Sequence, residues 1–335
     1  MKQILLIALS ICLFSSALQA QELYRAKKVN YQSETLDQIF YDYEVYDLNF
    51  QELRADLLKH PNQYYFQLEM GDLSAKLNLY ANDLRAENYK LQVATSEGVK
   101  ELESGPNRNF RGCTRSNHSA RVTVSDEIFG ASIYYDDFQV FAESMIYLDQ
   151  NGPRHLTVVY KNTDVRPTPN RKCGFDEVIH HGQMLENQIK DKLQESQKSA
   201  PTCWEFELAV ASDGLMTQHY GSVSAVESRN EDVLDDVRPL WNDGQFEEDI
   251  EYLLVTQFTS ETPSDDPWTS SRNASTLLAS FRSWGEGGGF GIGYDIACLW
   301  THRDLLGGTI GVAYLNGTCN SLKYHVCEDY GGSAV

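Results

Sequence analysis

Alternating hydrophobic and polar residues mark the first half of the chain. Successive side chains of a strand point to opposite faces, so a half-buried strand has a period of two. This pattern occurs in five stretches: 64–69, 75–80, 120–124, 132–135 and 156–160. Between about Asn49 and Lys59, Phe50, Leu53 and Leu57 instead share one face of a predicted helix. We therefore expect a β-rich first region.

The second half of the chain mixes strands with amphipathic helices. Residues 206–211 and 251–258 predict buried strands. Hydrophobic residues spaced by three and four predict a long helix from about Ser222 to Trp241 between them, and Asn273 is placed to cap another. Strands that alternate with helices predict an α/β fold, in which helices pack on a sheet.

A short strand between glycines follows, from Gly307 to Cys319. Its β-branched and aromatic residues are interrupted by Gly311, which suggests that something approaches the backbone closely there. An ordinary edge strand is the alternative interpretation.

The N-terminus has the features of a secretory signal peptide at residues 1–20. A short basic start precedes an apolar run from Ile4 to Leu18, and Ala17-Leu18-Gln19-Ala20 is a small-x-small cleavage site. The alternative, a buried N-terminal helix, is disfavoured because no polar residue divides the run into faces. No later segment is apolar enough to span a bilayer. We therefore expect a secreted protein.

The net charge and the cysteines narrow the function further. A net charge of −20 argues against binding nucleic acid or anionic membranes, which both require a basic face. Removal of Cys12 with the signal leaves six of the seven cysteines, and an oxidising compartment would favour their pairing. Cys173 differs, because basic residues and prolines surround it, and nearby cations favour the thiolate that binds metals. A structural disulfide at Cys173 is the alternative.

Three segments of the second half resemble metzincin zinc endopeptidases of the reprolysin (adamalysin) type, in the order of that family. Residues 206–220 resemble the first strand and turn, and residues 295–301 resemble an Asp-x-Ala-x-Leu-x-Thr segment. Residues 308–319 are similar to the edge strand, Gly-x-Ala-Tyr-x-Gly-x-x-Cys. The resemblance implies a metzincin-like mixed sheet with flanking helices.

The same resemblance implies a domain order. Segments at 110–112, 119–125 and 130–133 are similar, more weakly, to the β-rich propeptide of the family. Lys172-Cys173-Gly174 looks like a cysteine switch, in which Cys173 would bind the catalytic zinc of the latent enzyme. The implied order is listed as signal peptide 1–20, β-rich propeptide 21–181, linker 182–200 and the N-terminal part of the protease domain 201–335.

The resemblance also implies binding residues. An extended peptide would add a strand along the sheet edge, and the residues expected to bind it are Gly311, Val312, Ala313, Tyr314 and Leu315. Glu207 and Asp295 match acidic positions that hold a structural calcium ion, for which oxygen ligands are suited. A solvated strand end and a helix cap would explain the same two carboxylates.

The motif that carries the chemistry of the family, His-Glu-x-x-His-x-x-Gly-x-x-His, does not occur in the sequence. His180 and His181 are adjacent and do not share a helix face, and His302 and His325 are isolated and expected to be surface or locally hydrogen-bonded side chains. The sequence therefore predicts no catalytic residue and no stoichiometric zinc in this chain, which we interpret as a fragment. Cys319 matches a cysteine whose usual partner lies beyond the zinc helix, although pairing of Cys319 with Cys327 stays open.

Two functions remain after this comparison. The first is a secreted zinc-dependent metalloendopeptidase proenzyme that hydrolyses peptide bonds of proteins or peptides by zinc-activated water and is inactive as given. The second is a secreted non-catalytic binding protein, with a β-rich domain on a dead protease scaffold. The coding sequence after Val335 distinguishes them, because only the first requires the zinc motif within a few tens of residues.

Overall fold

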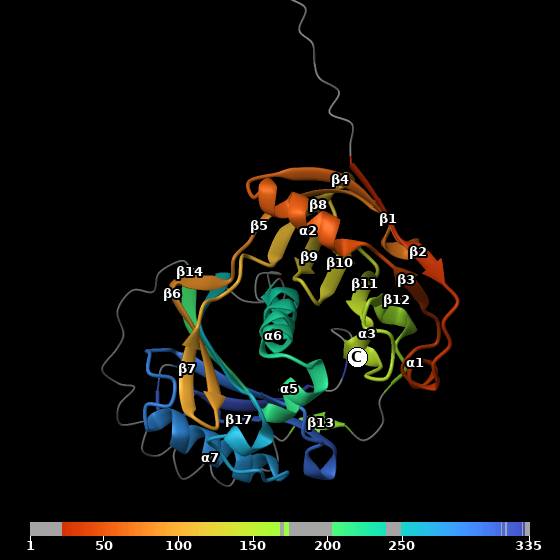
Figure 1. The fold of residues 1–335 in the computed structure, drawn as a ribbon. Helices are drawn as coiled ribbons and strands as arrows, with labels where there is room; N and C mark the ends of the chain where they lie inside the picture. The colour runs from red at the N-terminus through yellow and green to blue at the C-terminus, as the bar shows by residue number, and fades with distance from the viewer. Residues whose placement is uncertain are drawn as a thin grey trace, which may run out of the picture.

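Two β-sheets with a helix between them make up the structure, a computed structural model (Figure 1). The residues it describes are 22–167, 171–173, 203–238, 249–315, 317–318, 320–329 and 331. The long helix α6 (Val223–Val237) lies between the sheets, and α7 (Ala274–Glu286) lies on the far side of the second sheet. This is a mixed α/β fold preceded by a β-rich part, as the sequence predicted.

The first sheet contains ten described strands, and its neighbours are antiparallel except for the parallel pair β1 and β4. In spatial order the strands are β1 (Glu22–Arg25), β4 (Tyr64–Glu69), β5 (Ala75–Ala81), β8 (Asn109–Thr114), β9 (Ser119–Val124), β10 (Phe129–Tyr134), β11 (Gln139–Ser144), β12 (Leu156–Lys161), β3 (Glu44–Asp47) and β2 (Lys27–Val29). Helix α2 (Phe50–Lys59) buries Leu53 and Leu57 in a core that includes Phe66 and Leu79 of this sheet. The smaller helices are α1 (Glu34–Ile39) and α3 (Met145–Leu148), with 3₁₀ turns at Gly71–Leu73 and Asn162–Asp164.

The second sheet contains eight described strands and has a parallel centre. In spatial order they are β13 (Lys172–Cys173), β17 (Thr309–Ala313), β18 (Tyr324–Glu328), β16 (Ile296–Thr301), β14 (Cys203–Ser212), β15 (Asp249–Ser260), β6 (Arg85–Thr95) and β7 (Gly98–Leu102). Helix α5 (Gly214–Tyr220) follows β14, and further 3₁₀ turns lie at Pro263–Asp265 and Leu306–Gly308. No helix in the described ranges is both long and apolar enough to cross a membrane.

The hairpin of β6 and β7 comes from the first half of the chain but belongs to the second sheet. β6 pairs in parallel with β15, where Gln257 is opposite Leu91 and Thr259 is opposite Val93. Leu91 and Val93 are both buried. The two halves of the sequence are therefore joined within one sheet, and the boundary expected near residues 182–200 stays a prediction because it falls outside the described residues.

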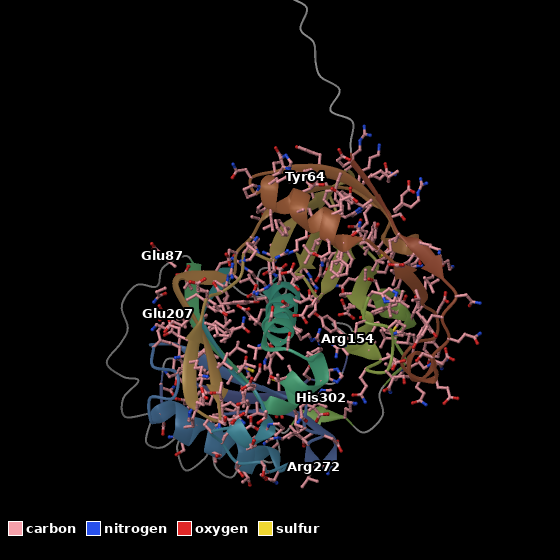
Figure 2. All side chains as sticks on the ribbon, in the orientation of Figure 1. Tyr64, Glu87, Arg154, Glu207, Arg272 and His302 are labelled. Atoms are coloured by element: carbon pink, nitrogen blue, oxygen red, sulfur yellow. The ribbon has the colours of Figure 1, made fainter. Side chains whose placement is uncertain are left out.

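The face of the second sheet toward α6 shares a hydrophobic core with the first sheet. Val226 and Leu234 of α6 pack in one cluster with Leu208 of β14, and this cluster reaches Ile146 and Tyr147 beside the first sheet. Arg154, labelled in Figure 2, adds a polar link, because its guanidinium donates to backbone carbonyl oxygens at the end of α5. The opposite face of the second sheet packs against α7 in a separate core.

The other side of α6 carries acidic residues that are buried against arginines of the first sheet. Arg108 contacts Glu227 at 2.6 Å and Glu231 at 2.7 Å. Arg121 contacts Asp232 at 2.9 Å and also pairs with Asp236. With the pair of Arg111 and Asp235 at 3.3 Å, three arginines face five carboxylates of the helix and offset part of their charge.

Gly130 of β10 allows this close approach of α6. A Cβ atom at Gly130 would lie 2.5 Å from a carboxylate oxygen of Asp232. Any side chain there would displace that carboxylate from its contact with Arg121.

Most predicted elements are present in the structure. β4, β5, β9, β10, β12, α2 and β14 match the predicted stretches within a few residues, and the side chain of Asn273 accepts a hydrogen bond from the Thr276 backbone, as a cap does. α6 was predicted to extend to Trp241, but residues 239–248 lie outside the described part. Helix α5 was missed, because its seven residues are too few to show a helical period.

Candidate functional site at the edge of the second sheet

β17, the strand predicted to bind substrate, lies beside β18 near one edge of the second sheet. Its pairing with β18 is antiparallel, with Gly311 opposite Cys327 and Ala313 opposite His325. Val312 is buried toward α7, whereas Ala313 is exposed. Tyr314 and Leu315 follow the strand, and Leu315 is exposed. The expected binding residues therefore form a continuous segment, although their role stays a prediction.

The outer side of β17 is taken by β13. The two strands are parallel, with Lys172 opposite Thr309 and Cys173 opposite Gly311. The predicted switch residue, Cys173, and the predicted substrate strand are thus brought together by backbone pairing. The pairing also puts Cys173 in one cross-strand row with Gly311 and Cys327. Whether Cys173 acts as a switch is not tested by this arrangement.

Gly311 has no side chain to project between these strands. A Cβ atom there would meet the carbonyl oxygen of Val326 at 3.3 Å and the Sγ atom of Cys327 at 3.7 Å. The sequence suggested that something approaches the backbone at Gly311, and the structure places β18 on one side of it and β13 on the other.

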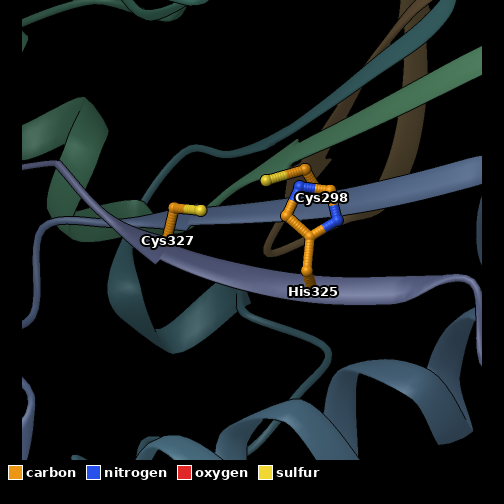
Figure 3. A group of neighbouring side chains, drawn as sticks. All are labelled: Cys298, His325 and Cys327. Carbon is orange, nitrogen blue, oxygen red and sulfur yellow. The ribbon is translucent and has the colours of Figure 1, made fainter. Parts of the chain in front are cut away.

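Three potential metal ligands meet on the same face of this sheet (Figure 3). Cys298 of β16 is paired with His325 of β18, and Cys327 follows His325 at the spacing that returns to the same face of a strand. Their ligand atoms all lie within 4.8 Å of one another. The prediction that His325 is isolated was therefore wrong, because parallel pairing of β16 and β18 brings it to two cysteines.

Burial determines the protonation of this group, which we call the Cys–His cluster. It lowers the pKa of His325 to about 4, so the imidazole is neutral at pH 7. Burial also raises the pKa of the Cys298 thiol, whereas a hydrogen bond from Cys298 lowers the pKa of Cys327. The cluster thus offers a neutral imidazole and one thiol that ionises more readily than the other.

A cavity of about 690 Å³ opens beside the Cys–His cluster. Its lining is mainly apolar and includes His325 and Cys327, together with Ala313 and Tyr314 at the end of β17. Residues of α6, among them Val233 and Leu234, form the opposite wall. A ligand in this cavity would therefore reach both the cluster and the end of the predicted substrate strand.

The cysteines do not all pair as expected from an oxidising compartment. Cys113, Cys298 and Cys327 are free thiols in the structure. Cys327, for which the sequence left pairing with Cys319 open, is one of these free thiols and belongs to the Cys–His cluster. Cys319 itself lies outside the described residues.

Glu207, in the middle of β14, and Asp295, directly before β16, are the predicted calcium ligands and lie side by side. The backbone N–H of Glu207 donates to Asp295 Oδ2 at 3.0 Å, and the backbone N–H of Asp295 donates to the Glu207 carbonyl at 2.8 Å. The Asp295 carboxylate therefore accepts a hydrogen bond from a backbone N–H group inside β14. Calcium binding stays a prediction.

The remaining histidines differ in their surroundings. His302 Nδ1 is 2.8 Å from the carbonyl oxygen of Asp329, so it is locally hydrogen-bonded as predicted. Its ring lies 4.0 Å from that of His219, whose pKa is lowered to about 4 mainly by burial. His180 and His181 lie outside the described residues.

Residues 202–335 match the family model for metallo-peptidase family M12B, reprolysin-like. This segment therefore resembles a reprolysin-like metallopeptidase domain. It contains β14 to β18, and hence both the Cys–His cluster and the predicted substrate strand, whereas β13 and the β6–β7 hairpin precede it. The match supports a general resemblance to zinc metallopeptidases, a class whose substrates are peptides or proteins.

Among solved structures, the crystal structure of metalloproteinase-II from Bacteroides fragilis aligns with a TM-score of 0.43 and 13% sequence identity, over 84% of this chain and 80% of that chain. No curated protein matches the sequence.

The residues of this chain do not provide the ligand set that holds the catalytic zinc in this family. The three-histidine motif does not occur among the 335 residues, and the reprolysin-like domain from residue 202 onward contains only His219, His302 and His325. His219 and His302 face each other and backbone carbonyls, whereas His325 lies with the two cysteines. No catalytic step through that ion can be derived from these residues.

Proposed function

We propose that the chain is the latent precursor of a secreted metalloendopeptidase. In this proposal, residues 1–20 direct export, residues 21–181 act as the propeptide, and residues 182–200 link it to the protease domain that begins at 201. The family match of residues 202–335 supports the peptidase assignment. The signal-like N-terminus supports export.

The observation that carries the proposal is the pairing of β13 with β17. An extended peptide that adds to a sheet edge is held by main-chain hydrogen bonds, whatever its side chains. β13 uses the edge of β17 in this way, with Cys173 opposite Gly311. A substrate that needs the same edge would have to displace β13, and in this proposal the pairing is what keeps the precursor latent.

A charged contact adds to this pairing. Arg171, next to β13, lies 3.8 Å from Glu328 at the end of β18. The segment that precedes Cys173 is therefore attached to the strand next to β17 as well as to β17 itself. An ion pair of this kind, with the arginine partly exposed, contributes at most about 1 kcal/mol, so it would guide the segment more than hold it.

Along the unblocked edge, β17 would orient a peptide by its backbone. Gly311 allows close approach, and the exposed Ala313 and Leu315 present small apolar contacts to the peptide. Because main-chain hydrogen bonds do not distinguish side chains, we expect a broad preference for extended polypeptide segments.

The test is the substitution Cys173→Ala in the precursor expressed from its complete open reading frame. The expected result is cleavage of a quenched fluorescent peptide without prior processing, while the unprocessed wild type stays inactive. Cys113→Ala is the matched control, because Cys113 is a free thiol of β8 in the other sheet and its loss should leave latency unchanged.

Two results would contradict the proposal. Unchanged latency of the Cys173→Ala precursor would rule out the switch role of Cys173 but not the peptidase function. An open reading frame that continues past Val335 without His-Glu-x-x-His would remove the peptidase itself.

A further inference from the structure

We propose that Cys298, His325 and Cys327 form a binding site for one zinc ion that is separate from the catalytic zinc of the family. The three side chains come from strands β16 and β18 of the second sheet and not from a zinc-binding helix. The site is independent of the proposed protease function, because it uses none of the residues assigned to the substrate or to the switch.

The donor set suits zinc. Zn²⁺ takes thiolate sulfur at about 2.3 Å and imidazole nitrogen at about 2.0–2.1 Å in a tetrahedral arrangement, so neighbouring sulfur ligands lie about 3.8 Å apart. The three ligand atoms already lie within 4.8 Å of one another. A small inward movement of side chains would complete the shell without any change in the strands. Calcium and magnesium are excluded because they require oxygen ligands.

The strand register argues against a disulfide between the two cysteines. Cys298 is opposite His325, so Cys327 is displaced by two residues along β18. With strands about 4.8 Å apart and a rise of about 3.3 Å per residue, the two Cα atoms are separated by about 8 Å. A disulfide requires Cα atoms within about 7 Å. A metal ion can bridge the two cysteines at this separation, whereas a disulfide bond would require the backbone to move.

His325 is available as a ligand. Among the described residues, no hydrogen bond to its ring is present, although the ring lies against the sheet face beside two thiols. Polar groups in such surroundings ordinarily have a partner. A coordinated ion would provide that partner and would also join the Sγ atoms of Cys298 and Cys327.

The fourth coordination position would face the cavity. His325 and Cys327 line the 690 Å³ cavity, whereas Cys298 lies in the hydrophobic core behind them. Zinc sites with four protein ligands are closed, and sites with three protein ligands keep a position for water or another ligand. The ion should therefore exchange and be removable by a small chelator that enters from the cavity.

The experiment is metal analysis of the complete 335-residue chain, purified under reducing conditions and loaded with Zn²⁺ or Co²⁺. We expect one equivalent of metal per chain, where the sequence alone predicted none, and a thiolate-to-cobalt charge-transfer band. The double variant Cys298→Ser/Cys327→Ser should lose both the equivalent and the band. Cys113→Ser should keep both.

A conservative variant separates binding from folding. His325→Cys retains a ligand and should keep one equivalent of metal with a stronger charge-transfer band, whereas His325→Ala should lose the metal. Far-UV circular dichroism and the melting temperature of the metal-free forms would show that each variant is folded.

Three results would overturn the proposal. They are metal content of the wild type no higher than that of the double variant, a full equivalent retained by the double variant, or a Cys298–Cys327 disulfide found by mass spectrometry of the unreduced protein.

Discussion

Arg121 shows, at the scale of single residues, how charge is buried between the two sheets. It projects from β9 of the first sheet and is only 3% exposed. Its guanidinium contacts Asp232 at 2.9 Å and pairs with Asp236, both on α6. Burying these carboxylates without a partner would cost free energy, and the contact with the arginine offsets that cost.

Replacing Arg121 by methionine should therefore destabilise the protein strongly. The substitution keeps most of the side-chain volume but leaves two buried carboxylates without a cation, which costs about 3–5 kcal/mol. Urea denaturation followed by fluorescence would measure the change in the free energy of unfolding.

Arg272→Met is the control. The ion pair of Arg272 with Asp304 is exposed on both sides, and such pairs contribute less than about 1 kcal/mol. Equal effects of the two substitutions would mean that Arg121 is not buried as the structure shows.

At the scale of elements, α6 begins with a cap that also contacts the first sheet. Ser222 Oγ accepts a hydrogen bond from the Ala225 backbone at 3.0 Å and donates to the carboxylate of Glu127 at 2.8 Å. One hydroxyl therefore satisfies a free N–H group of the helix and binds the loop between β9 and β10.

Ser222→Ala should reduce the stability of the protein by about 1 kcal/mol, because it removes the acceptor at the helix start. Ser222→Gly should cost only a few tenths of a kcal/mol, because glycine is a fair cap residue. The melting temperatures of the two variants, compared with that of Glu127→Gln, would separate the cap from the contact with the loop. Equal losses for alanine and glycine would contradict a capping role.

Prediction from sequence succeeded for elements whose signal is local. β4 and β5 alternate in polarity, α2 has its helical spacing, and Asn273 is a recognisable cap. Each of these features is determined within about a dozen neighbouring residues.

Pairings between distant segments could not be predicted in the same way. The Cys–His cluster depends on the register of β16 against β18, and a shift of one residue would turn the partner residues to opposite faces. A His-x-Cys pair in one strand and a cysteine in another buried strand was the only signal available. The burial of the acidic side of α6 likewise depends on distant residues, because its arginine partners lie in the first sheet.

At the scale of the whole molecule, the two parts of the chain are attached by three kinds of contact. The hydrophobic core around Val226 is shared between the sheets, the arginines of the first sheet pair with α6, and β6, β7 and β13 extend the second sheet. Each contact is long-range in sequence and does not depend on residues 182–200.

Cutting the chain should therefore leave the two parts associated. After cleavage at a specific protease site introduced within residues 182–200, both fragments should elute together in size-exclusion chromatography and separate only in denaturant. Concentrated salt should not part them, since it screens exposed charges much more than buried pairs. Separate elution in physiological buffer would show that the contacts between the parts are weak.

The β6–β7 hairpin has a consequence for how the protein is made. During synthesis, Arg85–Leu102 leaves the ribosome long before β15, the strand that it will cover. A reprolysin-like domain produced from residue 202 onward would expose the bare side of β15, and an unpaired strand edge of this kind recruits other chains and aggregates. We therefore expect the domain to stay soluble at higher concentration when residues 85–102 are supplied, either in the same polypeptide or as a co-expressed one.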